Sequence, residues 1–264
     1  MPTDFSPIAD HALQFAIEIA AVCQSEIFLF HVYHINKIDY DPNFAKDKQP
    51  FANQVERSMN QTKRKFRQVM EEKGLTVHTK VEEATIFSLF NRIAPELGID
   101  LIVMGSQGAS GLSRIVFGSV AATAMEIAEA PVLVVPYKAK FQQISHIVLA
   151  VDRKEISPEA LLPLQELALA FGADVTLLNV STATDQHIFQ KIDVTLEGVH
   201  TNYKEVPLSK SINDTINEYC EKEGCDLLCM IRREKGFFES LFQKSITKTQ
   251  VYNSPTPLLV LPHA

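Results

Sequence analysis

The residues best suited to chemistry lie in one glycine-rich segment, Met104–Val120. Its glycines are spaced so that the chain can bend around a ligand: Gly105, Gly108, Gly111 and Gly118. Glycine lets a backbone approach a ligand closely, and free amides at a helix N-terminus attract anions. Ser119 can cap the following helix or hydrogen-bond a phosphate. The pattern predicts a phosphate-binding loop that is neither a Walker loop nor a dinucleotide fingerprint. The alternative is a turn that only starts the helix.

A loop of this kind needs a strand before it and a helix after it, and the pattern of apolar residues predicts both. In the first half we predict a helix from Pro7 and helices over Asn53–Lys73, Ile86–Leu97 and Ser119–Glu129. The strands predicted there are Ile27–Val32, Leu75–Val81, Leu101–Met104 and Val132–Val135. Strands alternating with helices indicate a parallel sheet covered on both faces, with ligands bound at the strands' carboxyl ends.

The second half repeats the first. Two pairs of segments recur at a spacing of 126 residues: Pro131–Pro136 with Pro257–Pro262, and Gly98–Met104 with Gly224–Met230. A third pair, Ile27–Val32 and Val175–Val180, is 148 residues apart, so the first half carries 22 extra residues in its middle. The chain is therefore a diverged tandem duplication. We divide it at the short linker into residues 1–140 and 141–264.

The elements predicted for the second half follow the same order. The strands are Ile147–Val151, Val175–Val180, Leu227–Ile231 and Leu258–Leu261, and the middle of this half is shortened. The helices are Pro158–Phe171, Ser211–Glu223 and Ser245–Tyr252.

The two halves differ at their first strand. Asp152 follows the apolar run His146–Val151, whereas only Met1, Pro2 and Thr3 precede Asp4. Two interpretations stay open. Either the start has been placed too late, or the first half has a rearranged sheet completed by another segment or chain.

Composition narrows the function classes. The 264 residues are 46% hydrophobic and 22% charged, with a net charge of −7, which is typical of a folded globular chain. Without a basic block, nucleic-acid binding is not expected. No signal peptide is visible and no apolar run is long enough for a membrane helix, so no membrane partner is expected.

Four cysteines in a chain of this length do not form a disulfide framework. We therefore expect a cytoplasmic protein. Cys220, Cys225 and Cys229 lack a partner set for a metal, and we interpret them as buried and inert. We predict no metal site and no catalytic residues. His31 and His34 are interpreted as partly exposed histidines at a strand end.

The spacing Gly105-x2-Gly108-x9-Gly118-Ser119 resembles the nucleotide-binding signature of the universal stress protein family. Asp100–Gly105 before it and Ala130–Pro136 after it are also family-like. The resemblance spans both halves and implies two tandem, doubly wound α/β domains. Each would have a five-stranded parallel sheet of order 3-2-1-4-5, with the first strand of the first domain mostly missing. It also implies that Val132–Val135 pairs with Leu258–Leu261; a homodimer is left open.

The resemblance further implies a nucleotide site in the first half that binds ATP, with or without Mg²⁺. Asp4 would lie near the adenine or ribose, Val32 would meet adenine through its backbone, and Met104 and Gly105 would line the floor. The phosphates would be held by the remaining motif positions, Gly108, Gly118, Ser119 and Val120.

The loop of the second half has lost the motif. At the spacing of 126, Gly105, Gly108 and Gly118 become Ile231, Glu234 and Lys244. We therefore predict a cytoplasmic stress-response protein that binds ATP in its first domain, with a structural or regulatory second domain. The alternatives are a nucleotide-free interaction protein, a protein that binds a small apolar ligand, and an enzyme limited to slow ATP hydrolysis or autophosphorylation.

Overall fold

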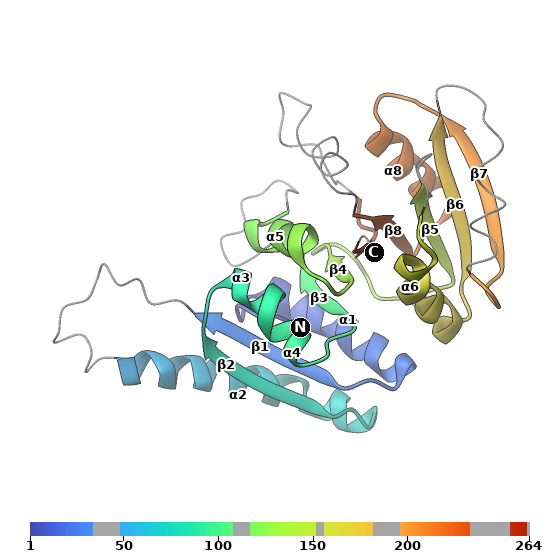
Figure 1. Ribbon diagram of the computed structural model, residues 1–264. Coiled ribbons are helices and arrows are strands. Elements are labelled where there is room, and N and C mark those ends of the chain that lie inside the picture. The colour runs from blue at the N-terminus through green and yellow to red at the C-terminus, as the bar shows by residue number, and fades with distance from the viewer. Residues whose placement is uncertain (34–47, 108–116, 152–155, 182–195, 233–253, 263–264) are drawn as a thin grey trace.

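The computed structural model describes residues 1–33, 48–107, 117–151, 156–181, 196–232 and 254–262 (Figure 1). For residues 48–52 it describes the backbone only. The first half contains four strands: β1 (Ile27–Tyr33), β2 (Val77–Glu83), β3 (Ile102–Gly105) and β4 (Val132–Val135). Its helices are α1 (Pro7–Cys23), α2 (Lys48–Glu72), α3 (Ile86–Ser88), the π-helical turn η3 (Leu89–Ile93), α4 (Ala94–Glu96) and α5 (Ser119–Ile127).

The second half contains five strands. They are β5 (His146–Val151), β6 (Asp174–Ser181), β7 (Thr201–Pro207), β8 (Leu227–Ile231) and β9 (Leu258–Leu261). Its described helices are α6 (Pro158–Phe171) and α8 (Ile212–Glu223). Both start at a serine whose hydroxyl accepts an N–H of the first turn, and both end at a glycine in the left-handed conformation.

The strand order of the second half is the predicted one. Within a seven-stranded sheet ordered β3-β4-β9-β8-β5-β6-β7, the strands of this half run β7-β6-β5-β8-β9, all parallel. Numbered within the half, that is 3-2-1-4-5. The doubly wound α/β fold is therefore confirmed.

The last strands of the two halves join the sheet. β4 pairs antiparallel with β9, with Leu133 opposite Leu259 at the centre of the register. Every residue of both strands is buried, so a continuous apolar seam connects the halves. In Figure 1, β4 lies near the C-terminal end of the chain, where β9 pairs with it.

The first residues of the chain lie in the position of a first strand. Pro2 bridges to Phe30 in parallel, and the Thr3 amide donates to the Phe30 carbonyl at 2.8 Å. At the spacing of 148, this bridge corresponds to Ala150 opposite Leu178 in the second half. Met1–Thr3 therefore has the register of the carboxyl end of a first strand. Within the described residues, β1 and β2 form a separate two-stranded sheet.

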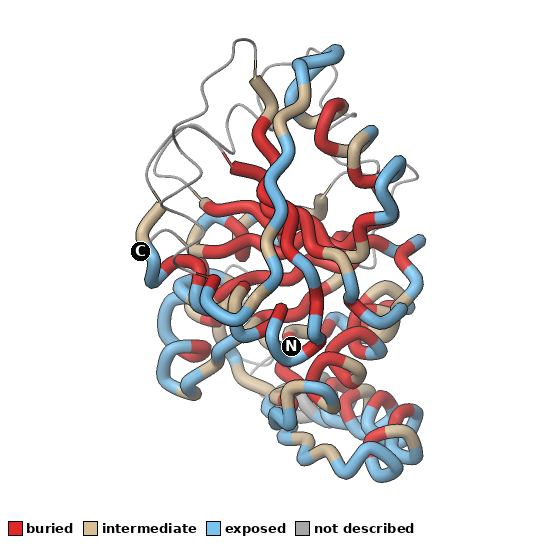
Figure 2. Tube along the Cα trace, turned by 90° about the vertical axis from the view of Figure 1, so that its right-hand side faces the viewer, coloured by how far each residue is buried: buried red, intermediate tan, exposed pale blue. Residues whose placement is uncertain are grey.

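Helices cover both faces of the sheets and create two apolar layers, visible as the buried strands and helix faces of Figure 2. One layer joins α1, α2 and α6 to the sheet through residues such as Leu13, Met59 and Leu164. The other joins η3, α5 and α8 through Phe90, Met125 and Ile216. Among the described residues, no helix is long and apolar enough to cross a membrane.

Several elements differ from their sequence predictions. β2 lies two residues later than predicted, and β7 was not predicted; both have mostly half-buried or exposed side chains, as edge strands do. The predicted helix over Ile86–Leu97 is interrupted by η3 just before Pro95, which has no N–H to continue an α-helical ladder. The predicted helix over Ser245–Tyr252 lies outside the described residues.

Candidate functional site

The predicted site residues gather at the carboxyl ends of β1 and β3 and at the start of α5. Gly108 lies outside the described residues. The other predicted positions are described: Asp4, Val32, Met104, Gly105, Gly118, Ser119 and Val120. Met104 is buried under the site, whereas Asp4, Ser119 and Val120 are exposed.

The first turn of α5 has backbone amides that could bind an anion. Gly118 is the N-cap of this helix, and among the described residues no side chain caps the first turn. The first amides of a helix have no intrahelical acceptor, so within the described part of the chain the N–H groups of Ser119 and Val120 remain for a ligand or water. The Gly118 amide itself is used internally, because it donates to the Ser106 carbonyl at 2.7 Å. Of the predicted phosphate-holding positions, those at Ser119 and Val120 therefore have the better geometry.

Gly118 has an ordinary extended backbone, with φ −61° and ψ 157°. Its residue type is thus not required by a positive φ. The lack of a side chain next to the open helix terminus is consistent with close approach of a ligand.

Gly105 has a different explanation. A Cβ at this position would lie 2.6 Å from the Ile8 Cγ2 atom and 3.1 Å from the Ile8 carbonyl oxygen. The first turn of α1 therefore occupies the space that a side chain would need. The glycine is explained by packing of α1 on β3, a tertiary contact that the sequence motif could not reveal.

Asp4 belongs to a tight turn that leads into α1. Its Oδ1 atom accepts the Ser6 amide at 3.0 Å, and the residue between them, Phe5, has φ 62°. Phe5 stacks on His31 with ring centroids 4.6 Å apart, and His31 Nδ1 lies 2.7 Å from the Thr3 carbonyl, to which it must donate. His31 thus ties Thr3 to β1, and Asp4 stabilises the turn that follows. His34 lies outside the described residues.

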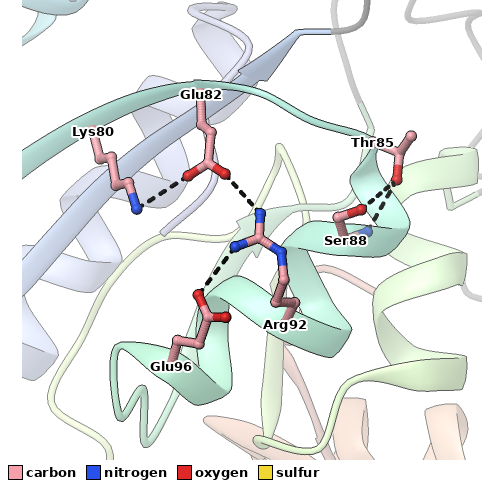
Figure 3. A network of polar contacts seen from close by, with 6 residues as sticks. All are labelled: Lys80, Glu82, Thr85, Ser88, Arg92 and Glu96. Atoms are coloured by element: carbon pink, nitrogen blue, oxygen red, sulfur yellow. Dashed lines mark hydrogen bonds and ion pairs between the residues drawn. The ribbon is translucent and has the colours of Figure 1, made fainter.

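The adenine side of the predicted site borders a network of charges that the motif search did not find (Figure 3). Val32 is paired with Glu82 across the β1–β2 ladder. Glu82 contacts Arg92 at 2.7 Å and Lys80 at 3.0 Å, and hydrogen bonds from these cations hold its pKa below the ordinary value. Arg92 also reaches Glu96 at 3.0 Å. The network connects the end of β2 to η3 and α4. Lys80 and Arg92 balance the negative charge of Glu82.

The corresponding loop of the second half is used for contact between the halves. Arg232, at the position of Ser106, donates from Nη1 to the Ala128 carbonyl at 2.7 Å, just beyond the end of α5. A cation at a helix C-terminus is favourable because carbonyl groups there lack partners. Burial lowers the pKa of Arg232, whereas the nearby carboxylates of Glu126 and Glu129 act to raise it. Asp152, Glu234 and Lys244 lie outside the described residues.

The cysteines match the prediction that they are buried. Cys220, Cys225 and Cys229 are buried free thiols, and burial raises the pKa of Cys229. Cys23 is only half-buried. Within the described ranges, no group of three or more His, Cys, Asp or Glu side chains is placed to hold a metal ion.

These features define a class: tandem, doubly wound α/β domains with a glycine-rich loop between a strand and a helix in the first half. The model of the universal stress protein family matches residues 1–136 and 183–262. The chain therefore belongs to the universal stress protein family, and it is a tandem member because the match covers both halves.

Individual relatives agree with this assignment. Universal stress protein MJ0531 of Methanocaldococcus jannaschii is 32% identical over 136 residues, which is 51% of this chain and 79% of the relative. MJ0577 of the same organism is 27% identical over 150 residues, 52% of this chain and 93% of the relative. The crystal structure of a universal stress protein from Archaeoglobus fulgidus covers 100% of this chain and 97% of its own, with TM-score 0.74 and 18% identity. That structure supports the fold of the whole chain.

Proposed function

We propose that this stress-response protein binds one ATP molecule at the start of α5 in its first half. The observation that carries the proposal is the exposed, uncapped first turn at Ser119 and Val120, directly after the glycine-rich loop. Helix amides and the positive end of the helix dipole favour phosphate oxygens. Universal stress proteins in complex with cAMP and with dAMP are among the solved structures similar to parts of this chain.

The base end would occupy the surface between Val32 and the turn at Asp4, with Met104 beneath it. Mg²⁺, if bound, would be coordinated by phosphate oxygens and water, since the described residues provide no cluster of ligands for it. Hydrolysis needs a positioned water and a base. The described part of the site provides no evident base, so we propose binding rather than turnover.

The second half would act as a structural partner. It carries Ile231, at the end of β8, and Arg232 where the first half has Gly105 and Ser106. Because Arg232 donates to the Ala128 carbonyl and Ile231 has a bulky side chain, we do not expect this segment to bind phosphate. We propose domains of residues 1–140 and 141–264, packed through β4 and β9 as an intramolecular pair, in a cytoplasmic protein.

Calorimetric titration of ATP, with and without Mg²⁺, into the full chain and two variants tests this proposal. Gly118→Val keeps an allowed backbone but places two methyl groups beside the helix terminus, so we expect at least tenfold weaker binding. Ser119→Ala should weaken binding less. Ser157→Ala, which removes the N-cap of α6 in the other half, is the matched control and should leave the affinity unchanged. Equal affinities for the parent and Gly118→Val would refute the proposal.

A further inference from the structure

A cavity of about 250 Å³, which we call the seam pocket, lies between the two halves. Three parts of the chain line it: α1 of the first half, the linker that follows β4, and the starts of β8 and β9 in the second half. Small-molecule sites often lie between domains and typically have volumes of about 300–1,000 Å³. The seam pocket is slightly below that range, so a ligand would be small and would contact both halves.

The inner wall of the seam pocket is apolar. It includes Phe15 and Ile19 of α1 and Leu133 of β4, and all three are buried core residues. Phe141 of the linker extends this wall, because its ring packs edge-on against Phe15 with the ring centroids 5.3 Å apart. Core packing already holds these side chains in place, so an apolar ligand could cover them with little further ordering.

The rim of the seam pocket carries two cations. Lys138 and Lys140 line the pocket on either side of Ala139, which is buried. The Ala139 amide donates to the Pro136 carbonyl at 3.0 Å, so both lysines extend from an anchored turn. Within the described part of the chain, neither ammonium group has an ion-pair or hydrogen-bond partner. In a chain of net charge −7, two such cations at one cavity favour an anionic ligand.

Asp226 also lines the seam pocket, but its carboxylate is already occupied. Its Oδ2 atom accepts the amides of Ser145 and His146, and its Oδ1 atom accepts the side-chain amide of Gln142. These bonds use much of the accepting capacity of the carboxylate, which argues against a ligand that carries a cation. The two lysines therefore determine the charge preference of the pocket.

We propose that the seam pocket binds a small carboxylic acid with an apolar tail, of the short-chain fatty acid class. The carboxylate lies between Lys138 and Lys140, and the tail covers Phe15, Ile19 and Leu133. Burial of the tail supplies most of the affinity, about fourfold for each buried methylene group. The seam pocket shares no residue with the predicted nucleotide site, so this proposal does not depend on nucleotide binding.

Saturation-transfer NMR of the full chain with sodium hexanoate, 1-hexanol and hexylamine tests the charge preference. Hexanoate should bind about fivefold more tightly than 1-hexanol, because only the acid pairs with the lysines, and hexylamine should bind most weakly. Butanoate, which is two methylene groups shorter, should bind about tenfold more weakly than hexanoate. Equal affinities for hexanoate and 1-hexanol, or for hexanoate and butanoate, would overturn the proposal.

Two double variants test the lysines. Lys138→Gln combined with Lys140→Gln should weaken hexanoate binding about fivefold and leave 1-hexanol binding unchanged. The matched control is Lys204→Gln combined with Lys210→Gln, two exposed lysines of the second half that do not line the seam pocket. It should bind hexanoate as the parent does. An unchanged hexanoate affinity in the first variant, or equal losses in both, would contradict the assignment.

Methyl NMR spectra of isoleucine-labelled protein locate the ligand. Hexanoate should shift the signals of Ile19 and Ile144, which line the seam pocket, and leave that of Ile216, which lies in the other apolar layer. Shifts at Ile216 without shifts at Ile19 and Ile144 would place the ligand elsewhere and refute the proposal. Excess ATP or inorganic phosphate should leave the hexanoate-induced shifts in place. Displacement of hexanoate by either would show that the lysines hold phosphate, which would also overturn the proposal.

Discussion

The two aspartates at equivalent positions of the repeat should contribute very differently to stability. Asp226 accepts the amides of Ser145 and His146 and the Ser145 hydroxyl, whereas Asp100 has no partner among the described residues. We therefore compare Asp226→Ala with Asp100→Ala in the full chain. The two substitutions remove the same atoms from the same position in the fold, so intrinsic effects of alanine cancel.

The expected size follows from the contacts. A hydrogen bond to a charged group contributes about 1.5–3 kcal/mol net, and truncation leaves two amides at the start of β5 without their acceptor. Asp226 is half-buried, so water can replace part of the lost hydrogen bonding. We therefore expect Asp226→Ala to lower the free energy of unfolding by about 2–4 kcal/mol. Asp100→Ala should change it by less than about 0.5 kcal/mol, as an unpaired surface residue does.

The same contacts set a pH dependence. Burial alone would raise the pKa of Asp226, but the hydrogen bonds from Ser145, His146 and Gln142 hold it below its ordinary value. A carboxyl group whose pKa is lowered by folding stabilises the protein above its unfolded pKa, about 3.9, and the contribution is lost as the pH falls through the lower folded pKa. The difference between the parent and Asp226→Ala should be constant above about pH 5 and shrink in more acidic solution.

Urea unfolding followed by circular dichroism, at pH 7 and over a series down to pH 3, measures these differences. Equal urea midpoints for Asp226→Ala and Asp100→Ala would refute the assignment of the strand-start contacts. So would a pH-independent difference between Asp226→Ala and the parent.

Two other predictions concern packing and charge. Gly105→Ala should destabilise the first half by about 1–3 kcal/mol, because its Cβ would clash with Ile8; Ile8→Ala in the same chain should recover part of the loss, measured by urea unfolding. Arg232→Met should cost about 1–3 kcal/mol by removing the charged donor to Ala128, and a loss under 0.3 kcal/mol would show that this contact does not hold the halves together.

Most of the strands were predictable because they are short apolar runs between turn residues. Val132–Val135 and Leu258–Leu261 were predicted to the residue, since both are flanked by proline and fully buried. β7 was missed because it is an edge strand whose charged and polar side chains face solvent. A strand of that kind is defined by backbone pairing with β6, which apolar patterning does not report.

At the predicted site, sequence pattern and local structure agree at the start of α5. The glycine-rich pattern located the start of α5, and the exposed Ser119 and Val120 are consistent with it. The same pattern gave no sign that Gly105 accommodates Ile8, or that Asp4 holds a turn. Both depend on where α1 packs.

We propose that one half of this tandem universal stress protein binds a nucleotide and the other does not. The most direct measurement is the stoichiometry of ATP binding to the full chain, from calorimetry at protein concentrations well above the dissociation constant. We expect one ATP per chain, abolished or strongly weakened in Gly118→Val. Two ATP molecules per chain, or one that persists in Gly118→Val, would contradict the account.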